Sequence, residues 1–385
     1  PTVGESCRAV MKAKEVLSHE CADRLKWFDA IKAERDKLFE FGAVTKMSLA
    51  DLVREGIKDR PVGSMLILTD NDVRKKARIV VLGNQQTTKV NAFSSVVSYT
   101  TLRLFLSLGL RKWGDKMYIR QVDVTSAFLQ SELEPGETGV VVKPPVELVK
   151  AGLVEKDEYW RASGALYGQR EAPRRWRRTL REWVLKKGMR PSERDDDVYF
   201  GKDMVILVFV DDILALGLRT ATEWFMRELR ERFRCGQDHD VTKFIGIEVE
   251  RHGGRVKLHQ KEAVTKLLQQ YGMNDANSSH LPGEGGTRLE DTRDLGTELD
   301  EVEQSDFRSL VGSLMYIACN TRPDIMYQVG ALSCFMKQAN EIHATAAKRV
   351  LRYLQGSPCL GIWLGQDNNG SHASRGMIGA EPIVW

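Results

Sequence analysis

Apolar residues recur along this chain with two different periods, which predicts a mixture of helices and strands. A period near 3.6 predicts a helix over residues 23–41, where Leu25, Phe28, Ile31 and Leu38 share one face. The same criterion predicts further helices over residues 100–114, 174–187, 220–233, 307–320, 323–337 and 341–356. Helices are therefore expected along the whole chain, and most densely in its last third.

Strands are predicted between the helices of the first two thirds. The apolar runs 64–70 and 73–83 predict two strands around a turn at Asn71–Asp72. Residues 198–217 predict paired strands, and residues 244–260 predict a hairpin with a Gly-Gly turn. Because strands and helices are interspersed, we predict an α+β protein.

Two helix starts carry candidate capping residues. Residues 117–134 predict a strand that runs into a helix, with Thr125 or Ser126 at the N-cap. The helix over 220–233 is expected to be capped by Thr220 or Thr222. Both predictions rest on the hydroxyl oxygen, which can accept a hydrogen bond from an unpaired amide of the first turn.

Residues 274–306 interrupt these patterns. They are rich in Gly, Asp and Glu and poor in apolar residues, which is typical of a linker. We therefore divide the chain into five parts. These are an N-terminal extension at 1–22, a first structured region at 23–273, the linker at 274–306, a helical region at 307–363 and a tail at 364–385.

Composition narrows the class of protein. Of the 385 residues, 42% are hydrophobic and 29% are charged, which indicates a globular protein, and the net charge of +4 is by itself weak evidence for an anionic partner. Six scattered cysteines without zinc-ligand spacing predict reduced thiols in an intracellular protein. We expect no signal peptide and no membrane span, and the initial Pro1 predicts a fragment or a processed piece.

The segment MVILVFVDDILALG, residues 204–217, contains Asp211 and Asp212 inside an otherwise apolar run. A buried charge is costly unless it is paired or binds a metal. One interpretation is a polar hairpin turn, where Asp is common. The other is a cation site, because the apolar flanks predict strands in the middle of a sheet, and carboxylates at their tip suit a hard divalent cation.

Asp123 supplies a third carboxylate. In YIRQVDVTSAF it follows a predicted strand and precedes a predicted helix, at a junction from which a side chain can reach a cleft. It can equally be an N-cap or a strand-end residue. Aspartates of this kind can hold two Mg²⁺ ions about 3.5–4 Å apart, which activate a hydroxyl and stabilise a leaving oxygen in phosphoryl transfer.

Six segments occur in a specific order along the chain. They are QVDVTSAFLQSELE, LYGQREAPRRW, LVFVDDILALG, FIGIEVER, RSLVGSLMYIACNTRPDIMYQVGALS and HATAAKRVLRYLQGSPCLGI. This ordered set resembles the reverse transcriptase of copia-type LTR-retrotransposon Pol polyproteins, over roughly residues 25–363. The resemblance implies a right-hand polymerase fold, with a palm of antiparallel strands and helices on one face. It also implies fingers near residues 42–115, a primer-seating hairpin at 244–259 and a helical thumb or connection region beyond the linker.

The resemblance further implies a reaction, namely nucleotide transfer from a dNTP to a primer 3′-hydroxyl on an RNA or DNA template. The implied cofactors are two Mg²⁺ ions, with Mn²⁺ as an alternative. Asp123, Asp211 and Asp212 are then the catalytic residues and the metal ligands. Asp123 and Asp211 are expected to be the principal ligands, because adjacent strand residues such as Asp211 and Asp212 tend to point to opposite faces.

By the same resemblance, five further residues line the nucleotide site. Phe128 is expected against the sugar, where its ring excludes a 2′-hydroxyl, and the alternative is a core residue of a first helical turn. Lys76 and Arg78 are candidates to hold the triphosphate, and the alternative is a pair of solvated charges on an edge strand. Tyr167 and Gly168 fit the family segment that lines the nucleotide and template side.

Glu171 departs from the family pattern, which usually has Gln before Ala-Pro. A carboxylate there would repel phosphates if it faced them, which puts activity in question. A second hypothesis is therefore an inactive retrotransposon relic or a domesticated scaffold that keeps the fold and binds nucleic acid. A third, an unrelated Mg²⁺-dependent phosphotransferase, fits the ordered motifs poorly.

The segment RRWRRTLREW combines positive charge with aromatic rings. Arginine binds phosphate well and aromatic rings stack on bases, which predicts a nucleic-acid-binding helix. The alternative is a solvated helix face with Trp176 and Trp183 packed inward. The candidate nucleic-acid-binding residues are Arg174, Arg175, Arg177, Arg178 and Arg181.

The tail lies where the family's RNase H begins. Residues 364–385 hold one aspartate, Asp367, whereas an RNase H site needs several carboxylates, so RNase H activity is not expected. The expected partners are a template with its primer and dNTPs, without a membrane, and the oligomeric state stays open. The expected location is intracellular, in cytoplasmic virus-like particles, in the nucleus or in both.

Overall fold

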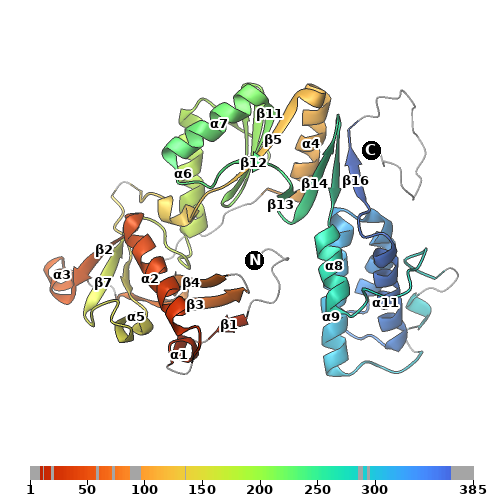
Figure 1. Ribbon diagram of the computed structural model, residues 1–385, viewed down its shortest axis with the longest axis horizontal. Helices are drawn as coiled ribbons and strands as arrows, with labels where there is room; N and C mark the ends of the chain where they lie inside the picture. The colour runs from red at the N-terminus through yellow and green to blue at the C-terminus, as the bar shows by residue number, and fades with distance from the viewer. Residues whose placement is uncertain are drawn as a thin grey trace.

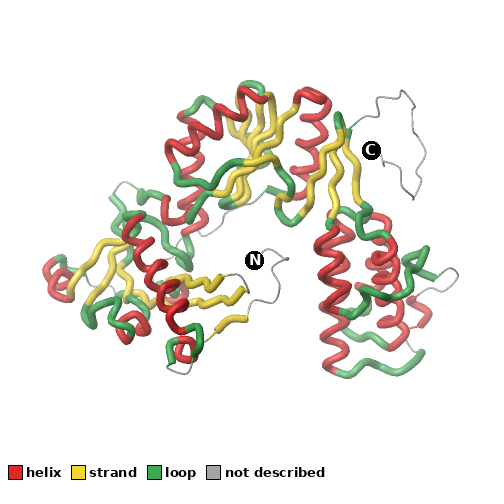
Figure 2. Tube along the Cα trace, viewed as in Figure 1, coloured by secondary structure: helices red, strands yellow, loops and turns green. Residues whose placement is uncertain are grey.

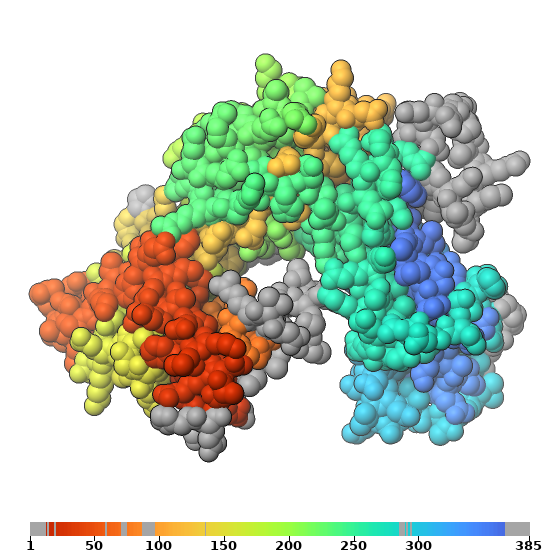
Figure 3. All heavy atoms as spheres, viewed as in Figure 1, coloured from red at the N-terminus to blue at the C-terminus, as the bar shows by residue number. Residues whose placement is uncertain are grey.

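The computed structural model describes residues 9–11, 13–18, 21–57, 60–71, 74–86, 97–134, 136–284, 289–292 and 295–365. The turn residue Asp72 and the tail residues 366–385 lie outside these ranges. Three units follow one another along an arch, with two strand-rich units first and a helical unit last (Figures 1 and 2). In the space-filling view the arch is open on its lower side (Figure 3). We call the units the fingers, the palm and the helical unit.

The fingers are built on a six-stranded sheet in the order β1-β3-β6-β7-β2, with β4 also paired to β3. The strands are β1 Ala9–Met11, β2 Val44–Ser48, β3 Val62–Asn71, β4 Arg74–Val81, β6 Val141–Lys143 and β7 Glu158–Ala162. The helices are α1 Ala13–Val16, α2 Arg24–Glu40, α3 Leu49–Arg54 and α5 Val146–Lys150. Helix α2 lies against β4.

Helix α2 confirms the predicted helix and part of its predicted face. Trp27, Ile31 and Leu38 are buried, whereas Leu25 is 78% exposed. The buried stripe therefore starts at Trp27, whose large ring contributes more apolar area to the core than Leu25 would.

The extent of the fingers also differs from the prediction of residues 42–115. Strands β6 and β7, which lie beyond residue 115, complete the fingers sheet by pairing with β3 and β2. Helix α4, Tyr99–Trp113, packs instead on the palm. These pairings join segments that are far apart in the sequence, so local periodicity carries no sign of them.

The palm is a six-stranded sheet in the order β12-β5-β11-β10-β9-β8, antiparallel throughout. The strands are β5 Met117–Asp123, β8 Arg190–Pro191, β9 Val198–Gly201, β10 Met204–Phe209, β11 Asp212–Leu218 and β12 His239–Asp240. Helices α6, Ala172–Lys186, and α7, Arg219–Arg232, share one core with this sheet. Helix α4 covers the opposite face, where it shares a core with Ile119, Leu207 and Leu214. The central strands are thus buried on both faces, as their apolar flanks predict, and helices lie on both faces of the palm and not on one alone.

Neither predicted hydroxyl cap forms, although Ser126 occupies the N-cap position of the turn after β5. After β5 the chain forms only a 3₁₀ turn, η3 Ala127–Gln130, and the side chain of Ser126 makes no capping hydrogen bond. Ser126 has a left-handed φ of 53°, which prevents a regular helix start. Helix α7 begins at Arg219 with Leu218 at the N-cap, and the hydroxyl of Thr222 donates to the carbonyl of Leu218 at 3.2 Å.

A second antiparallel sheet joins the palm to the helical unit. Its strands are β13 Lys243–Phe244, β14 Ile247–His252, β15 Arg255–His259 and β16 Gly361–Leu364. Strands β14 and β15 form the predicted hairpin, and β15 also pairs with β16. The helices of the helical unit are α8 Lys261–Gln270, α9 Glu301–Asn320, α10 Met326–Ser333 and α11 Glu341–Gly356.

The structure divides the chain differently around the predicted linker at 274–306. Helix α8, on its N-terminal side, shares one core with α9, α10 and α11. Helix α9 begins inside the predicted linker, where Asp300 and Glu303 form a capping box. Between them, Leu289 and Thr292 are buried, so part of this polar segment packs onto the helical unit.

The expectations about cysteines and about membrane spans can be compared with the described residues. Cys21, Cys235, Cys319, Cys334 and Cys359 are all free thiols. Within the described ranges, no helix combines the length and the apolar character that crossing a membrane requires.

Candidate active site

The hairpin of β10 and β11 carries the paired aspartates at its tip. Phe209 and Asp212 are the last paired residues, so Val210 and Asp211 form the connecting turn. Val210 has a left-handed φ of 58°, a conformation that β-branched residues rarely adopt and for which hairpins favour Gly. The indole of Trp176 donates to the carbonyl of Val210 at 2.6 Å, and the amide of Val124 donates to the carbonyl of Asp211 at 2.9 Å. The surrounding palm therefore holds this strained turn from two sides.

Asp123 lies at the end of the neighbouring strand β5. In the antiparallel register it is directly opposite Asp212, and residues directly opposite each other share a face of the sheet. Asp211 lies one residue further, in the turn. The structure thus brings the three predicted carboxylates to one end of the palm sheet, with Asp212 on the same face as Asp123.

The three carboxylates act on one another electrostatically. Burial, followed by the charge of Asp211, raises the pKa of Asp123, and Lys76 partly opposes this. Burial raises the pKa of Asp212 to about 6, and the negative charges of Asp211 and Asp123 raise it further. A hydrogen bond from Gln121 acts in the opposite direction and lowers this pKa. Negative charge is therefore only partly compensated at this end of the sheet, and a bound cation would stabilise it.

The described residues contain no group of three His, Cys, Asp or Glu side chains placed to hold a metal ion. Mg²⁺ does not require such a cage, because it is usually bound by one or two carboxylates together with waters and substrate phosphates. Oxygen donors with partly compensated charge suit this ion. The residues present thus fit Mg²⁺ as a cation shared with a phosphate substrate.

Of the five predicted nucleotide-site residues, Lys76 acts on a palm carboxylate, and Arg78 and Phe128 both contact Tyr167. Lys76 and Arg78 lie two residues apart on β4, on one face of the strand. Lys76 lowers the pKa of Asp123, so its charge is within electrostatic reach of the palm. The guanidinium of Arg78 lies 5.7 Å from the ring centroid of Tyr167, and the ring of Phe128 meets that of Tyr167 edge-on at 5.9 Å.

The fifth residue, Gly168, explains how the loop with Tyr167 docks on the fingers. Gly168 has a φ of 88°, and a Cβ atom there would lie 2.2 Å from the carbonyl oxygen of Val81. Any other residue would therefore push the loop away from β4. The close approach allows the amide of Val81 to donate to the carbonyl of Tyr167 at 2.7 Å.

Sequence reasoning missed two neighbours of this site. The side-chain amide of Gln121 donates to Asp212 at 3.4 Å, and the period of two that places Gln121 on the face of Asp123 could have revealed it. Glu34 of α2 is buried, pairs with Lys37 at 2.5 Å and lies near Arg78. No sequence signal connects Glu34 with β4, because the contact is made between distant segments.

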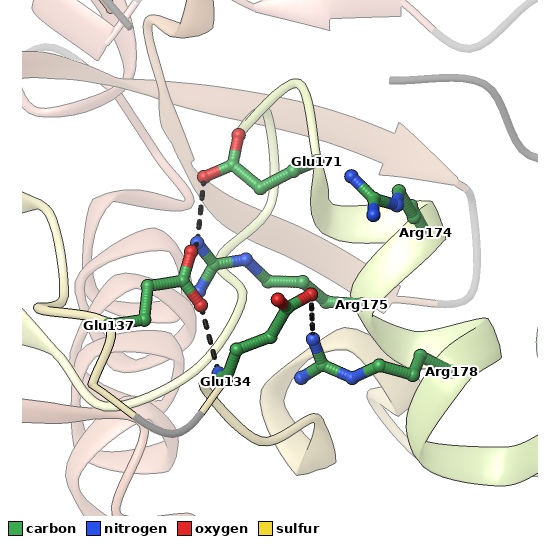
Figure 4. Close-up of a pocket in the computed structure, with 6 residues that line it drawn as sticks. All are labelled: Glu134, Glu137, Glu171, Arg174, Arg175 and Arg178. Atoms are coloured by element: carbon green, nitrogen blue, oxygen red, sulfur yellow. Dashed lines mark hydrogen bonds and ion pairs between the residues drawn. The ribbon is translucent and has the colours of Figure 1, made fainter. Parts of the chain in front are cut away.

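Helix α6 carries the five predicted nucleic-acid-binding arginines, and three of them pair with carboxylates of the same chain. Arg175 pairs with Glu137 and Glu171, and Arg178 pairs with Glu134 (Figure 4). Arg177 pairs with Asp196 at 3.0 Å. Trp176 and Trp183 are buried, as the alternative interpretation of this helix predicts. The nucleic-acid-binding role of Arg174, Arg175, Arg177, Arg178 and Arg181 stays a prediction.

The carboxylate of Glu171 is paired with other side chains of the protein. The residue is buried, with 4% of its surface exposed. Both carboxylate oxygens accept from the side-chain amide of Gln86 at 3.2 Å, and one accepts from Arg175 at 3.3 Å. The charge of Glu171 is therefore matched inside the protein, and the phosphate repulsion considered above does not follow from this geometry.

Comparison with known proteins places the chain in a family. The family described as "Reverse transcriptase (RNA-dependent DNA polymerase)" matches residues 48–284, more than half of the chain. The protein therefore belongs to this reverse transcriptase family, and its palm and fingers are those of a polymerase fold.

Its relatives are copia-type Pol polyproteins. The chain is 35% identical over 307 residues to the retrovirus-related Pol polyprotein from transposon RE1 of Arabidopsis thaliana, covering 77% of this chain and 20% of that protein. It is 29% identical over 360 residues to the corresponding polyprotein from transposon TNT 1-94 of Nicotiana tabacum, covering 89% and 26%. The chain thus spans about a fifth to a quarter of the length of these relatives.

A solved structure supports the fold. The foamy viral protease-reverse transcriptase dRH in complex with double-stranded DNA aligns with a TM-score of 0.50 and 13% sequence identity. The alignment covers 96% of this chain and 53% of that chain. At this identity the likeness concerns the fold alone.

Proposed function

We propose that this chain is the RNA-directed DNA polymerase part of a copia-type retrotransposon Pol polyprotein. It would join the α-phosphate of a dNTP to a primer 3′-hydroxyl, with release of pyrophosphate, on an RNA or DNA template. The observation that carries the proposal is the meeting of Asp123, Asp211 and Asp212 at one end of the palm sheet, within electrostatic reach of Lys76.

In this proposal, Asp123 and Asp211 are the principal ligands of divalent cations and Asp212 contributes to the same site. Two bound Mg²⁺ ions, or Mn²⁺, would supply activation of the primer hydroxyl and stabilisation of the leaving oxygen. The carboxylates position this chemistry at the hairpin tip. The strained turn at Val210 keeps Asp211 there, because Trp176 and Val124 hold both of its carbonyls.

The fingers would orient the nucleotide. Lys76 and Arg78 carry positive charge on the face of β4 that approaches the carboxylates, where they can bind the triphosphate. Phe128 and Tyr167 offer an aromatic wall beside them, against which a sugar and base can pack. We assign the arginines of α6 a role in binding the template or primer backbone.

Primer extension on an RNA template tests this proposal. The reaction would contain the chain, a labelled primer, all four dNTPs and Mg²⁺, with Asp211→Asn as the matched variant. We expect extension by the unsubstituted chain and a loss of at least about 100-fold in Asp211→Asn, because the substitution removes a metal ligand.

Two results would count against the proposal. Equal extension by both proteins would show that Asp211 is not a metal ligand of the active site. A protein that extends no primer but still binds primer–template would support the alternative of an inactive scaffold that retains the fold. Parallel reactions with Mn²⁺ and with a DNA template would show whether the metal or the template limits activity.

A further inference from the structure

Glu171 connects the fingers with the palm through buried polar contacts. On the fingers side its partner is Gln86, which ends the 3₁₀ turn η1, Gly83–Gln85, directly after β4. The side-chain nitrogen of Gln86 donates to both oxygens of Glu171 at 3.2 Å, and its side-chain oxygen accepts from the amide of Arg170 at 3.1 Å. One amide group of the fingers therefore binds both the backbone and the side chain of the segment before α6.

On the palm side the partner is Arg175, in the first turns of α6. Its guanidinium donates to Glu171 at 3.3 Å and also pairs with Glu137 (Figure 4). Gln86 is 9% exposed and Arg175 is 7% exposed, so neither can readily replace Glu171 with water. We call Gln86, Glu171 and Arg175 the Glu171 bridge.

The backbone next to the Glu171 bridge has little room for adjustment. A Cβ atom on Gly83 would lie 2.3 Å from the carbonyl oxygen of Gly168, nearly as close as the 2.2 Å between a Cβ on Gly168 and the carbonyl oxygen of Val81. The end of β4 and the loop with Tyr167 therefore meet at backbone contact distance. A shift at Gln86 would be transmitted along β4 toward Arg78 and Lys76, because the strand is a continuous hydrogen-bonded element.

We propose that Glu171 is a positioning residue that fixes β4 relative to the palm carboxylates and thereby sets the affinity for the incoming nucleotide. The inference rests on the proposed polymerase function, which supplies the roles of Lys76, Arg78 and Asp123. Glu171 acts on them through Gln86. The residue that departs from the family pattern thus has a structural task, and a Gln of equal length keeps an acceptor for its neighbours.

Steady-state kinetics test the proposal with four variants: Glu171→Ala, Glu171→Gln, Gln86→Ala and the Glu171→Ala/Gln86→Ala double variant. We expect Glu171→Ala to raise KM for dNTP about 10-fold with kcat changed less than about 3-fold, because the chemical groups stay in place. Gln86→Ala should match it, and the double variant should be no worse than either, because the two residues act as a unit. Glu171→Gln should restore KM. An unchanged KM, or a loss confined to kcat, would overturn the proposal.

Hydrogen exchange supplies a readout that needs no catalysis. In Glu171→Ala and Gln86→Ala, amides of residues 74–86 should exchange faster, whereas those of β10 and β11 should keep their rates. Unchanged exchange in 74–86 would contradict the Glu171 bridge even in an active enzyme. Faster exchange in a chain that never extends a primer would support the bridge and reject the polymerase function instead. If Glu171→Ala fails to fold, Gln86→Ala and Glu171→Gln decide the question in the same two assays.

Discussion

Two groups of three carboxylates lie in this molecule in opposite surroundings. At the end of the palm sheet, burial and the nearby charge of Asp211 raise the pKa of Asp123 and of Asp212 with little compensation. Beside helix α6, Glu134, Glu137 and Glu171 each pair with an arginine of that helix. The comparison teaches that carboxylates matched by the chain's own cations stabilise the scaffold, whereas the partly compensated ones are available for a ligand.

The largest expected effect concerns the palm group and separates activity from stability. Asp123→Asn should reduce primer extension by at least about 100-fold through loss of a metal ligand. Without metal, its free energy of unfolding should stay the same or increase, because the substitution removes repulsion by Asp211. Urea unfolding in EDTA and primer extension in Mg²⁺ measure the two effects.

A matched control is Asp238→Asn, which removes a carboxylate that contacts Arg120 and Arg230. This variant should lose stability, because the partly buried guanidinium of Arg120 loses its charged partner Asp238 and keeps only Asp240. If Asp123→Asn lost as much stability as Asp238→Asn, the distinction between partly compensated and paired carboxylates would be contradicted.

The second prediction concerns Arg175 in the α6 group. Arg175→Ala leaves Glu171 buried without its cation, and breaking a buried pair in this way costs about 3 kcal/mol. Chemical denaturation of the variant and the unsubstituted chain checks this value. A cost below about 1 kcal/mol would show that the pair behaves like an exposed one.

The third prediction concerns pH. The pKa of Asp212 is raised from 3.8 to about 6 in the folded protein, chiefly by burial. The folded chain therefore binds this proton more tightly than the unfolded chain, so the associated stability is present below pH 4 and is lost as the pH rises through 6. Burial also favours a higher pKa for Asp238, but the hydrogen bond from Arg120 and the charge of Arg230 outweigh it and lower the pKa. The stability that the Asp238 carboxylate contributes to the fold is present above the pKa of the unfolded chain and is lost as the pH falls through the lowered pKa of the folded chain.

Metal-free unfolding of Asp212→Asn and Asp238→Asn across pH 3–8 measures both contributions. Asp212→Asn should flatten the decline between about pH 4 and pH 6, and Asp238→Asn should flatten the loss on the acid side. The same pH profile in both variants would contradict the contrast between compensated and uncompensated carboxylates.

The smallest effect is expected at Arg178. Both partners of the Arg178–Glu134 pair are partly exposed, so Arg178→Ala should cost less than about 1 kcal/mol of stability. If the guanidinium contacts the nucleic-acid backbone, the variant should also release about one counterion fewer on binding. The slope of log K for primer–template binding against log salt concentration should then decrease by about one. An unchanged salt dependence would remove Arg178 from the interface.

The sequence was most informative where chemistry and fold are encoded in one short segment. Asp211 and Asp212 stand inside an apolar run, so the central hairpin of the palm could be predicted from the residues around them. The helices of the C-terminal third also follow their periodicity, and α11 has the predicted bounds. The family resemblance supplied the connection between Asp123 and the hairpin, which no local pattern contains.

Other features depend on contacts between distant segments and could not be predicted. The burial of Glu171 requires Gln86, which is 85 residues away in the sequence. The pairing of Arg175 with Glu137 likewise depends on tertiary structure, so the basic segment looked more exposed than it is. The left-handed φ of Val210 is imposed by the palm around the turn, against the preference of the residue itself.

The most direct test of the account is a Mg²⁺ titration of thermal stability, without nucleic acid, in the unsubstituted chain and Asp211→Asn. We predict a saturable rise in Tm for the unsubstituted chain, of about 2 °C at a Mg²⁺ concentration ten times the dissociation constant, and none in Asp211→Asn. Such a result would identify the partly compensated palm carboxylates as the cation site. An equal rise in both proteins, or no rise in either, would contradict that claim.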